Sequence, residues 1–473
     1  MAGNVITDTP ADGKISMAEL RIILIAVTLA SFITPYIGSA TNIALPLIGI
    51  EFGVDAVTLG WIPTVYLLTS AVFLVPAGRI ADMYGLKRIF TIGMGIFTLA
   101  AFLCGFATSA PVLIACEVLL GLGGAMIYAT GIAILSYAFP ASERGRVFGI
   151  TVAAIYIGLS AGPLIGGVLT VAFGWRSIFF IIVPAGLLTL ILTVTGIRGE
   201  WGDLNRRPFD STGALIYGIM LFSLIYGLSL IPSVIGFVLI GVACIAFVAF
   251  IVHELRVESP VLNIRLFSGN RTFSLSNLAA LINYSATASV AFLMSLYLQY
   301  NRGFDPMTAG LVLIAQSVMM ALFSPFAGRL SDIFEPRVVA SAGMGITALC
   351  LGAFAFLAED TPLLVIIGIL MLLGSGLAFF SSPNMNAIMS SVKKEHYGVA
   401  SGMTGTMRLI GQMLSMGIAM MIFSVIIGQV QITAASHSEL LQSIHIAFAF
   451  AAVLCTAGVI CSYIRGDVRR VEM

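Results

Sequence analysis

A short polar sequence between two apolar runs occurs twice in this chain. The first copy, GRIADMYGLKR, occupies residues 78–88, and the second, GRLSDIFEPR, occupies residues 328–337, 250 residues later. Gly78, Arg79 and Asp82 match Gly328, Arg329 and Asp332. Such a repeat indicates a duplicated membrane protein in which both halves carry the same connection between two spans.

The composition supports a membrane protein. Hydrophobic residues make up 59% of the chain and charged residues 10%, whereas charged residues are about 25% of ordinary soluble domains. The apolar runs are long enough to cross a bilayer as helices. They are too long for barrel strands, and period-two alternation is absent, so the backbone must be satisfied within helices. We predict an all-α polytopic membrane protein.

Fourteen apolar runs predict fourteen transmembrane helices with both termini on the cytoplasmic side. The predicted spans are 21–49, 57–77, 89–108, 111–138, 147–171, 177–197, 212–230, 232–252, 273–300, 307–328, 338–358, 362–382, 398–427 and 442–464.

Orientation follows from the positive residues, which are retained on the cytoplasmic side. Of 23 Lys and Arg residues, 20 lie in or beside cytoplasmic segments if the N-terminus is inside; Arg176 and Arg302 lie outside, and Arg408 lies within a span. Cytoplasmic examples are Lys87, Arg88, Arg144, Arg146, Arg206, Arg207, Lys393, Lys394, Arg469 and Arg470. The outer loops carry Glu51, Asp55, Asp305, Glu359, Asp360 and Glu439.

Several motifs resemble those of the major facilitator superfamily, and the number of spans resembles its fourteen-helix drug:proton antiporter subgroup. Gly78, Asp82, Gly85, Lys87 and Arg88 match the superfamily's G-x-x-x-D-x-x-G-x-[RK]-[RK] loop. The sequence GLSAGPLIGG, residues 158–167, matches a motif that marks exporters in this superfamily. The resemblance implies two six-helix bundles, in residues 1–200 and 272–473, with two inserted helices in residues 201–271.

Bundles that rock against each other need a cytoplasmic gate. The candidate gate residues are Gly78, Arg79, Asp82, Gly85, Lys87, Arg88 and Asp332. Gly85 permits a tight turn, and Asp82 can accept hydrogen bonds from a helix N-terminus or pair with Arg144 or Arg146. Alternatively, Lys87 and Arg88 serve only as cytoplasmic retention signals.

The exporter motif in span 147–171 supplies small residues and a proline. Its members are Gly158, Gly162, Pro163, Gly166 and Gly167. The glycines let a neighbouring helix approach closely, and proline removes a backbone donor. We expect these residues to pack closely against a neighbouring helix and, as a consequence, to favour one conformation of the protein.

Glu117 is an acid inside span 111–138. Such a charge costs roughly 2.5–3.5 kcal/mol on insertion scales, so it is rarely retained without a partner or a cavity. The family has an Arg at this position and an acid at the position of Ile37 in YIGSATNIALP, so the usual Asp–Arg pair becomes Ile–Glu here. We expect Glu117 to carry the proton; a structural hydrogen bond or contact with the outer face is the alternative.

Polar and aromatic residues within the spans are candidates to line a central cavity. The main set comprises Tyr36, Asn42, Trp61, Tyr66, Gln299, Asn384, Arg408 and Gln412, with Tyr156, Asn283, Gln316 and Asn386 as further members. Taken singly, each also suits an interhelical contact. As a set they predict a mostly apolar cavity for a lipophilic substrate, and a positive charge on that substrate would suit Glu117.

These observations predict a secondary active exporter of lipophilic or amphipathic small molecules in the cell membrane, working as a functional monomer by alternating access and proton antiport. Export of a dedicated metabolite or lipid-like compound with altered or no proton coupling is the alternative, and a non-transporting membrane sensor is a third. No CxxC pair occurs among the six cysteines, so no metal site is predicted. We expect no enzymatic activity, no cofactor and no nucleic-acid partner.

Overall fold

A computed structural model describes residues 16–201, 209–257, 260–262, 264–392, 397–428, 430–433 and 436–466. Fourteen of its helical segments are long and apolar enough to cross a membrane, which confirms the predicted all-helical polytopic fold. Six of the positive residues from which the orientation is predicted lie outside the described residues: Arg206, Arg207, Lys393, Lys394, Arg469 and Arg470.

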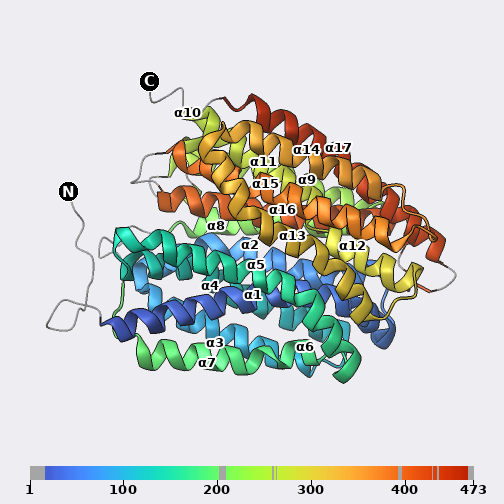
Figure 1. Cartoon of the computed structure of the whole chain (residues 1–473), viewed down its shortest axis with the longest axis horizontal. Coiled ribbons are helices and arrows are strands. Elements are labelled where there is room, and N and C mark those ends of the chain that lie inside the picture. Colours follow the sequence, from blue (N-terminus) through green and yellow to red (C-terminus); the bar gives the residue numbers. More distant parts are fainter. Residues whose placement is uncertain are drawn as a thin grey trace.

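The first six spans pack together (Figure 1). They are α1 (Met17–Phe52), α2 (Ala56–Tyr84), α3 (Leu86–Gly105), α4 (Ala110–Ala138), α5 (Ala141–Phe173) and, for the sixth, α6 (Ser177–Phe180) with α7 (Ile182–Gly196). Helix α1 lies against α4, α5 and α7, and α3 lies against α4 and α7. We call this group the N-terminal bundle.

The last six spans form a second group, the C-terminal bundle. Its first span is built from α11 (Arg271–Thr287), α12 (Val290–Leu296) and the π-helix η1 (Tyr297–Asn301). The other five are α13 (Pro306–Ile333), α14 (Pro336–Phe354), α15 (Leu363–Ser390), α16 (Tyr397–Ile426) and α17 (His437–Ile464).

Two further spans, α8 (Ser211–Ser229) and α9 (Val234–Arg256), form a hairpin, and the short helix α10 (Arg265–Gly269) precedes α11. The hairpin contacts both bundles, because α8 packs against α2 and also against α16. Trp61 of α2 donates to Ser229 at 3.2 Å, and Ser424 of α16 donates to the Ile231 carbonyl at 2.6 Å. The inserted pair therefore covers the seam between α2 and α16.

The repeated motif is mainly helical, which corrects the predicted ends of the two spans that precede it. Helix α2 continues to Tyr84 and α13 continues to Ile333, so the spans predicted to end at residues 77 and 328 extend further. The reason is that charged residues beyond the membrane can continue a helix. In the first copy Gly85 ends α2 with φ 110°, a conformation that favours glycine.

The duplication also includes the starts of α2 and α13. Asp55 accepts hydrogen bonds from the amides of Val57 and Thr58, both at 2.9 Å. Asp305 accepts from the amides of Met307 and Thr308 at 2.8 and 3.0 Å. Each aspartate is thus an N-cap that satisfies free amides of the first turn.

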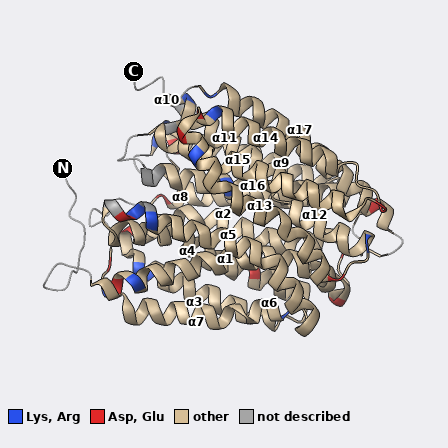
Figure 2. Cartoon of the chain, viewed as in Figure 1, with Lys and Arg blue, Asp and Glu red and all other residues tan. Residues whose placement is uncertain are grey.

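The start of α1 and the end of α17 lie at the same end of the molecule, and most of the described Lys and Arg residues gather at that end (Figure 2). Positive residues mark the cytoplasmic face, so this end is the cytoplasmic one. The opposite end carries the ion pair between Arg176 and Glu51 at 2.6 Å. The structure therefore gathers at one end the described positive residues from which the orientation is predicted.

Candidate functional site

The first copy of the repeated motif contacts a segment of its own bundle. The amide of Lys87 donates to the Glu200 carboxylate at 2.9 Å, and the amide of Leu86 donates to the Trp201 carbonyl at 2.8 Å. A Cβ atom at Gly85 would lie 2.5 Å from that carboxylate. Lys87 Nζ also donates to the Ile197 carbonyl. The motif therefore attaches the start of α3 to the end of the sixth span.

The remaining residues of the first motif copy lie along the end of α2. Gly78 faces α4, where a Cβ atom would lie 3.9 Å from Ala129. Arg79 is half-buried, whereas Asp82 and Arg88 are exposed. Gly85 and Lys87 thus meet residues 197–201, and Gly78 meets α4.

The second copy has a different local structure. Glu335 replaces the glycine and precedes α14 with φ −57°. Asn386 of α15 donates to Ser331 Oγ at 3.0 Å and to Asp332 Oδ1 at 3.4 Å. Asn386, a cavity candidate from the sequence, therefore lies beside the second motif copy.

The glycines of α5 face two neighbouring helices. Cβ atoms at Gly158 and Gly162 would overlap α1, the latter lying 2.9 Å from the Tyr36 carbonyl oxygen. A Cβ atom at Gly166 would meet Ala40 of α1 at 3.0 Å, while one at Gly167 would meet the Pro306 carbonyl oxygen of α13 at 2.5 Å.

A glycine of α13 likewise allows this helix to pack closely against α5. A Cβ atom at Gly310 would overlap the Pro163 carbonyl of α5. The motif in α5 therefore allows close approach both within the N-terminal bundle and across to the C-terminal bundle.

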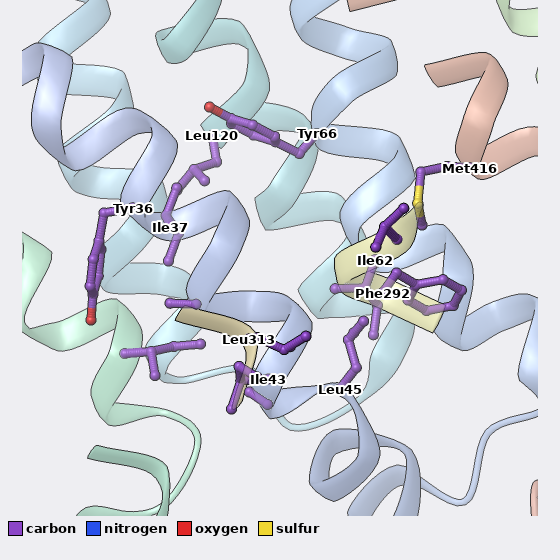
Figure 3. Packing of buried hydrophobic residues seen from close by; sticks show 14 of the residues in the cluster. Tyr36, Ile37, Ile43, Leu45, Ile62, Tyr66, Leu120, Phe292, Leu313 and Met416 are labelled. Carbon is purple, nitrogen blue, oxygen red and sulfur yellow. The ribbon is translucent and has the colours of Figure 1, made fainter. Parts of the chain in front are cut away.

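Glu117 of α4 is 2% exposed, and its Oε1 atom has no hydrogen-bond partner among the residues that the structure describes. Glu254 of α9 shows the contrast: it is 1% exposed, but the amides of Val261 and Leu262 donate to it at 3.2 and 2.8 Å. A buried polar atom without a partner is costly, so Glu117 differs from the structural acid Glu254. Ile37 of α1, where the family's acid would stand, is buried in the apolar core (Figure 3).

Tyr66 connects this acid to a group of aromatic and charged side chains from both bundles. Tyr66 of α2 lies within electrostatic reach of Glu117, Tyr128 and Arg408. Arg408 of α16 lies within reach of Tyr128, Tyr156 and Tyr284, and its Nε atom has no hydrogen-bond partner. We call these six residues the central cluster: Tyr66, Glu117, Tyr128, Tyr156, Tyr284 and Arg408.

Four residues of the central cluster were predicted from the sequence as candidate site residues: Tyr66, Glu117, Tyr156 and Arg408. Tyr128 and Tyr284 were not predicted. A phenol in the middle of an apolar span was the available signal for both residues. Their approach to Arg408 depends on how the two bundles face each other.

Other cavity candidates have structural partners. Trp61 donates to α8, and Gln299 donates to the Ile43 carbonyl at 2.9 Å. Asn384 accepts from buried Arg465 at 2.5 Å and donates to the Ser276 carbonyl at 3.1 Å.

The last candidates differ in their surroundings. Tyr36, Asn42 and Asn283 contain buried polar atoms without a partner. Gln316 and Gln412 are half-buried.

Two six-span bundles, connections that carry the repeated motif and a buried acid within a span are the arrangement of a membrane transporter. The sequence model of the family described as Major Facilitator Superfamily matches residues 27–255 and 277–472 of this chain. The chain therefore belongs to the Major Facilitator Superfamily, and it is a transporter rather than an enzyme.

Relatives have been described as transporters of different solutes. The chain is 31% identical to riboflavin transporter RibZ of Clostridioides difficile, over 83% of this chain and 86% of the relative. It is 33% identical to multidrug resistance protein Stp of Mycobacterium tuberculosis, over 84% and 74%. Identity to the tetracenomycin C resistance and export protein of Streptomyces glaucescens is 27%, over 86% and 76%.

Solved structures share the fold at low sequence identity. A bacterial homologue of the human lysosomal transporter Spinster, in an inward-facing and unoccupied conformation, superposes with a TM-score of 0.71 at 17% identity, covering 95% of this chain and 97% of that one. A peptide transporter POT superposes with a TM-score of 0.68 at 13% identity, covering 92% and 93%.

Proposed function

We propose that this transporter exports lipophilic or amphipathic small molecules from the cytoplasm across the cell membrane, as a monomer, by alternating access and in exchange for protons. The observation that carries the proposal is Glu117, a buried acid of the central cluster with one oxygen that has no hydrogen-bond partner among the described residues. The names of the multidrug and tetracenomycin relatives support export of this class of compound.

The central cluster gives a physical reason for exchange. Deprotonated Glu117 and Arg408 have opposite charges, and both residues lie within electrostatic reach of Tyr66. When Glu117 is deprotonated it attracts a cationic group on the substrate; when it is protonated that attraction is lost, while the charge of Arg408 remains. A proton and a cationic substrate therefore compete for the same site, which is the requirement for antiport.

The repeated motif supports movement between the bundles. Asp82 and Asp332 occupy equivalent places at the cytoplasmic ends of α2 and α13. We propose that the two motif copies form the cytoplasmic gate, with Gly85 and Lys87 keeping α3 attached to residues 197–201 as the N-terminal bundle moves.

Export of one dedicated metabolite, with altered or no proton coupling, is the second candidate. The substitution of the helix 1 acid by Ile37 favours it, as does similarity to a protein named as a riboflavin transporter. Under this alternative, Arg408 and the tyrosines bind a planar polar compound, and Glu117 has a structural role.

Transport in proteoliposomes separates these candidates. A panel of lipophilic cations, neutral lipophilic compounds and flavins is tested with and without a pH gradient, using wild-type protein, Glu117→Gln and Glu117→Asp. We expect the gradient to stimulate wild-type transport of cations at least tenfold, Glu117→Gln to lose this stimulation, and Glu117→Asp to retain part of it. Gradient-driven transport that is undiminished in Glu117→Gln would contradict the proton role.

A further inference from the structure

The extracellular ends of the two bundles meet at a proline in α1. Pro46 has no N–H group, so the carbonyl of Asn42, four residues earlier, has no donor within its own helix. Ser295 of α12 donates to this carbonyl at 2.7 Å. A side chain of the C-terminal bundle thus uses an acceptor that α1 cannot satisfy itself.

Two more donors reach the same stretch of α1. Gln299 Nε2 donates to the Ile43 carbonyl at 2.9 Å and to Ser295 Oγ at 3.0 Å. The Tyr300 hydroxyl donates to the Pro46 carbonyl at 3.2 Å. One strip of α1 backbone therefore accepts hydrogen bonds from three side chains of the other bundle.

The π-helix η1 explains how these donors share a face. The Arg302 amide donates to the carbonyl of Tyr297, five residues earlier, at 3.0 Å. This wider turn brings residues four and five positions after Ser295 onto the side of the helix that faces α1. Single π-turns are rare within α-helices and are frequent at functional sites.

Apolar side chains of the two bundles also meet in this part of the molecule. Phe292 and Met416 of the C-terminal bundle lie near Ile62 of the N-terminal bundle, and Leu313 of α13 lies near Ile43 (Figure 3). Ser295 itself is fully buried. Gln299 and Tyr300 are half-buried, so the hydrogen bond from Ser295 is the one best shielded from water, and such shielding strengthens a hydrogen bond.

We propose that these residues form the extracellular gate: Ser295, Gln299 and Tyr300 bind the backbone carbonyls of Asn42, Ile43 and Pro46 and hold the transporter closed to the outside. The gate must break before a substrate can leave outward. Because the Asn42 carbonyl takes no part in the hydrogen bonding of α1, the gate opens without unfolding that helix, and water then satisfies the carbonyl.

This inference rests on the proposed alternating-access function, so its test measures conformation without a substrate. Spin labels are placed at Thr108 and Asp360, which are exposed at the extracellular ends of the two bundles, in a background whose native cysteines are replaced. The distance distribution between the labels is recorded in lipid nanodiscs by pulsed electron resonance.

The test compares gate variants with a matched control. Ser295→Ala combined with Gln299→Leu removes two donors. Ser285→Ala is the control, because its hydroxyl bonds the Leu281 carbonyl of its own helix at 2.8 Å. Loss of these two hydrogen bonds between the bundles is expected to raise the ratio of long to short distances about tenfold, whereas the control matches the wild type.

Pro46→Ala tests the backbone part of the gate. The new N–H group competes with Ser295 for the Asn42 carbonyl, so we expect a smaller shift in the same direction. If the double variant does not fold, Tyr300→Phe removes only a hydroxyl and is expected to give a partial shift.

If the distance distribution between the spin labels is unchanged in the folded gate variants, the proposed extracellular gate is wrong. If the distances shift toward longer values but the protein transports none of the panel compounds, the result supports the gate and contradicts the proposed function.

Discussion

At the scale of single residues, the glycines of α5 show how one missing side chain decides a helix contact. A Cβ atom at Gly158 would overlap the backbone carbonyl of Phe32, which cannot rotate away as a side chain would. Gly149, on the same helix, has nothing within 4 Å of its own Cβ position. The two positions are therefore a matched pair for substitution.

We expect Gly158→Ala to lower the stability of the protein by about 1–3 kcal/mol, since overpacking forces the backbone to shift. Gly149→Ala is expected to leave stability unchanged or to raise it slightly, because alanine favours the helix. Thermal unfolding of both purified variants in detergent measures the difference. Equal melting temperatures for the two variants would contradict the packing role of Gly158.

At the scale of elements, the start of α3 depends on a residue far away in the sequence. Glu200 accepts from the Lys87 amide, 113 positions apart, and the space for its carboxylate exists because residue 85 has no side chain. An acid near a helix N-terminus is also stabilised by the helix dipole.

We expect Glu200→Ala to increase amide hydrogen exchange at Lys87 roughly tenfold, because its hydrogen bond to a charged group is lost. Glu143→Ala is the control, as Glu143 is an exposed acid in the first turn of α5. Exchange measured by mass spectrometry on both variants reports the effect. No change at the start of α3 would show that the Glu200 contact contributes little.

The N-cap of α13 provides a pH-dependent element. The Thr308 amide and hydroxyl donate to the Asp305 carboxylate and lower its pKa, with a further bond from the Met307 amide. A lowered pKa in the folded state means that the stabilisation is present above the unfolded pKa of about 3.9 and is lost as the pH falls through the folded value.

We therefore expect Asp305→Ala to cost about 1 kcal/mol at neutral pH, with the difference from wild type disappearing as the pH falls below about 4. Asp305→Asn keeps a capping oxygen without a titrating charge, so its stability is expected to vary less with pH. Unfolding of the three proteins across a pH series checks both statements. A constant difference between wild type and Asp305→Ala at all pH values would exclude the titration.

At the scale of the whole molecule, the inserted hairpin connects the two bundles on one side. Tyr217 of α8 donates to the Ala71 carbonyl of α2 at 3.4 Å, while Ile225 packs against Gly417 of α16. The hairpin therefore has to follow, or to limit, any movement of α2 relative to α16.

We expect Ser229→Ala and Ser424→Ala each to increase hydrogen exchange in the turn between α8 and α9 by several fold, since each removes one bond between the hairpin and a bundle. Their effects are expected to add, because the two bonds go to different bundles. Ser136→Ala, whose hydroxyl bonds its own helix on α4, is the control. An increase in only one of the variants would mean that a single bundle holds the hairpin.

The sequence predicts the transmembrane spans more completely than it predicts the residues of the candidate site. Apolar length was enough to predict fourteen spans, because each helix satisfies its own backbone in the bilayer. The end of α2 was predicted seven residues too early, at residue 77 instead of Tyr84, because hydropathy detects the membrane and not the helix. Glu117 stood out because an acid is costly in lipid, whereas Tyr128 and Tyr284 carry no such penalty and were missed.

The sequence by itself determined the duplicated membrane architecture, the orientation and the buried acid, since these follow from apolar length, positive residues and the cost of a charge. Only the tertiary structure decided that Ser295 binds the Asn42 carbonyl and that Glu200 caps α3. These contacts join positions 253 and 113 residues apart. The proline and the glycine that permit them are visible in the sequence, but their partners depend on how the helices pack.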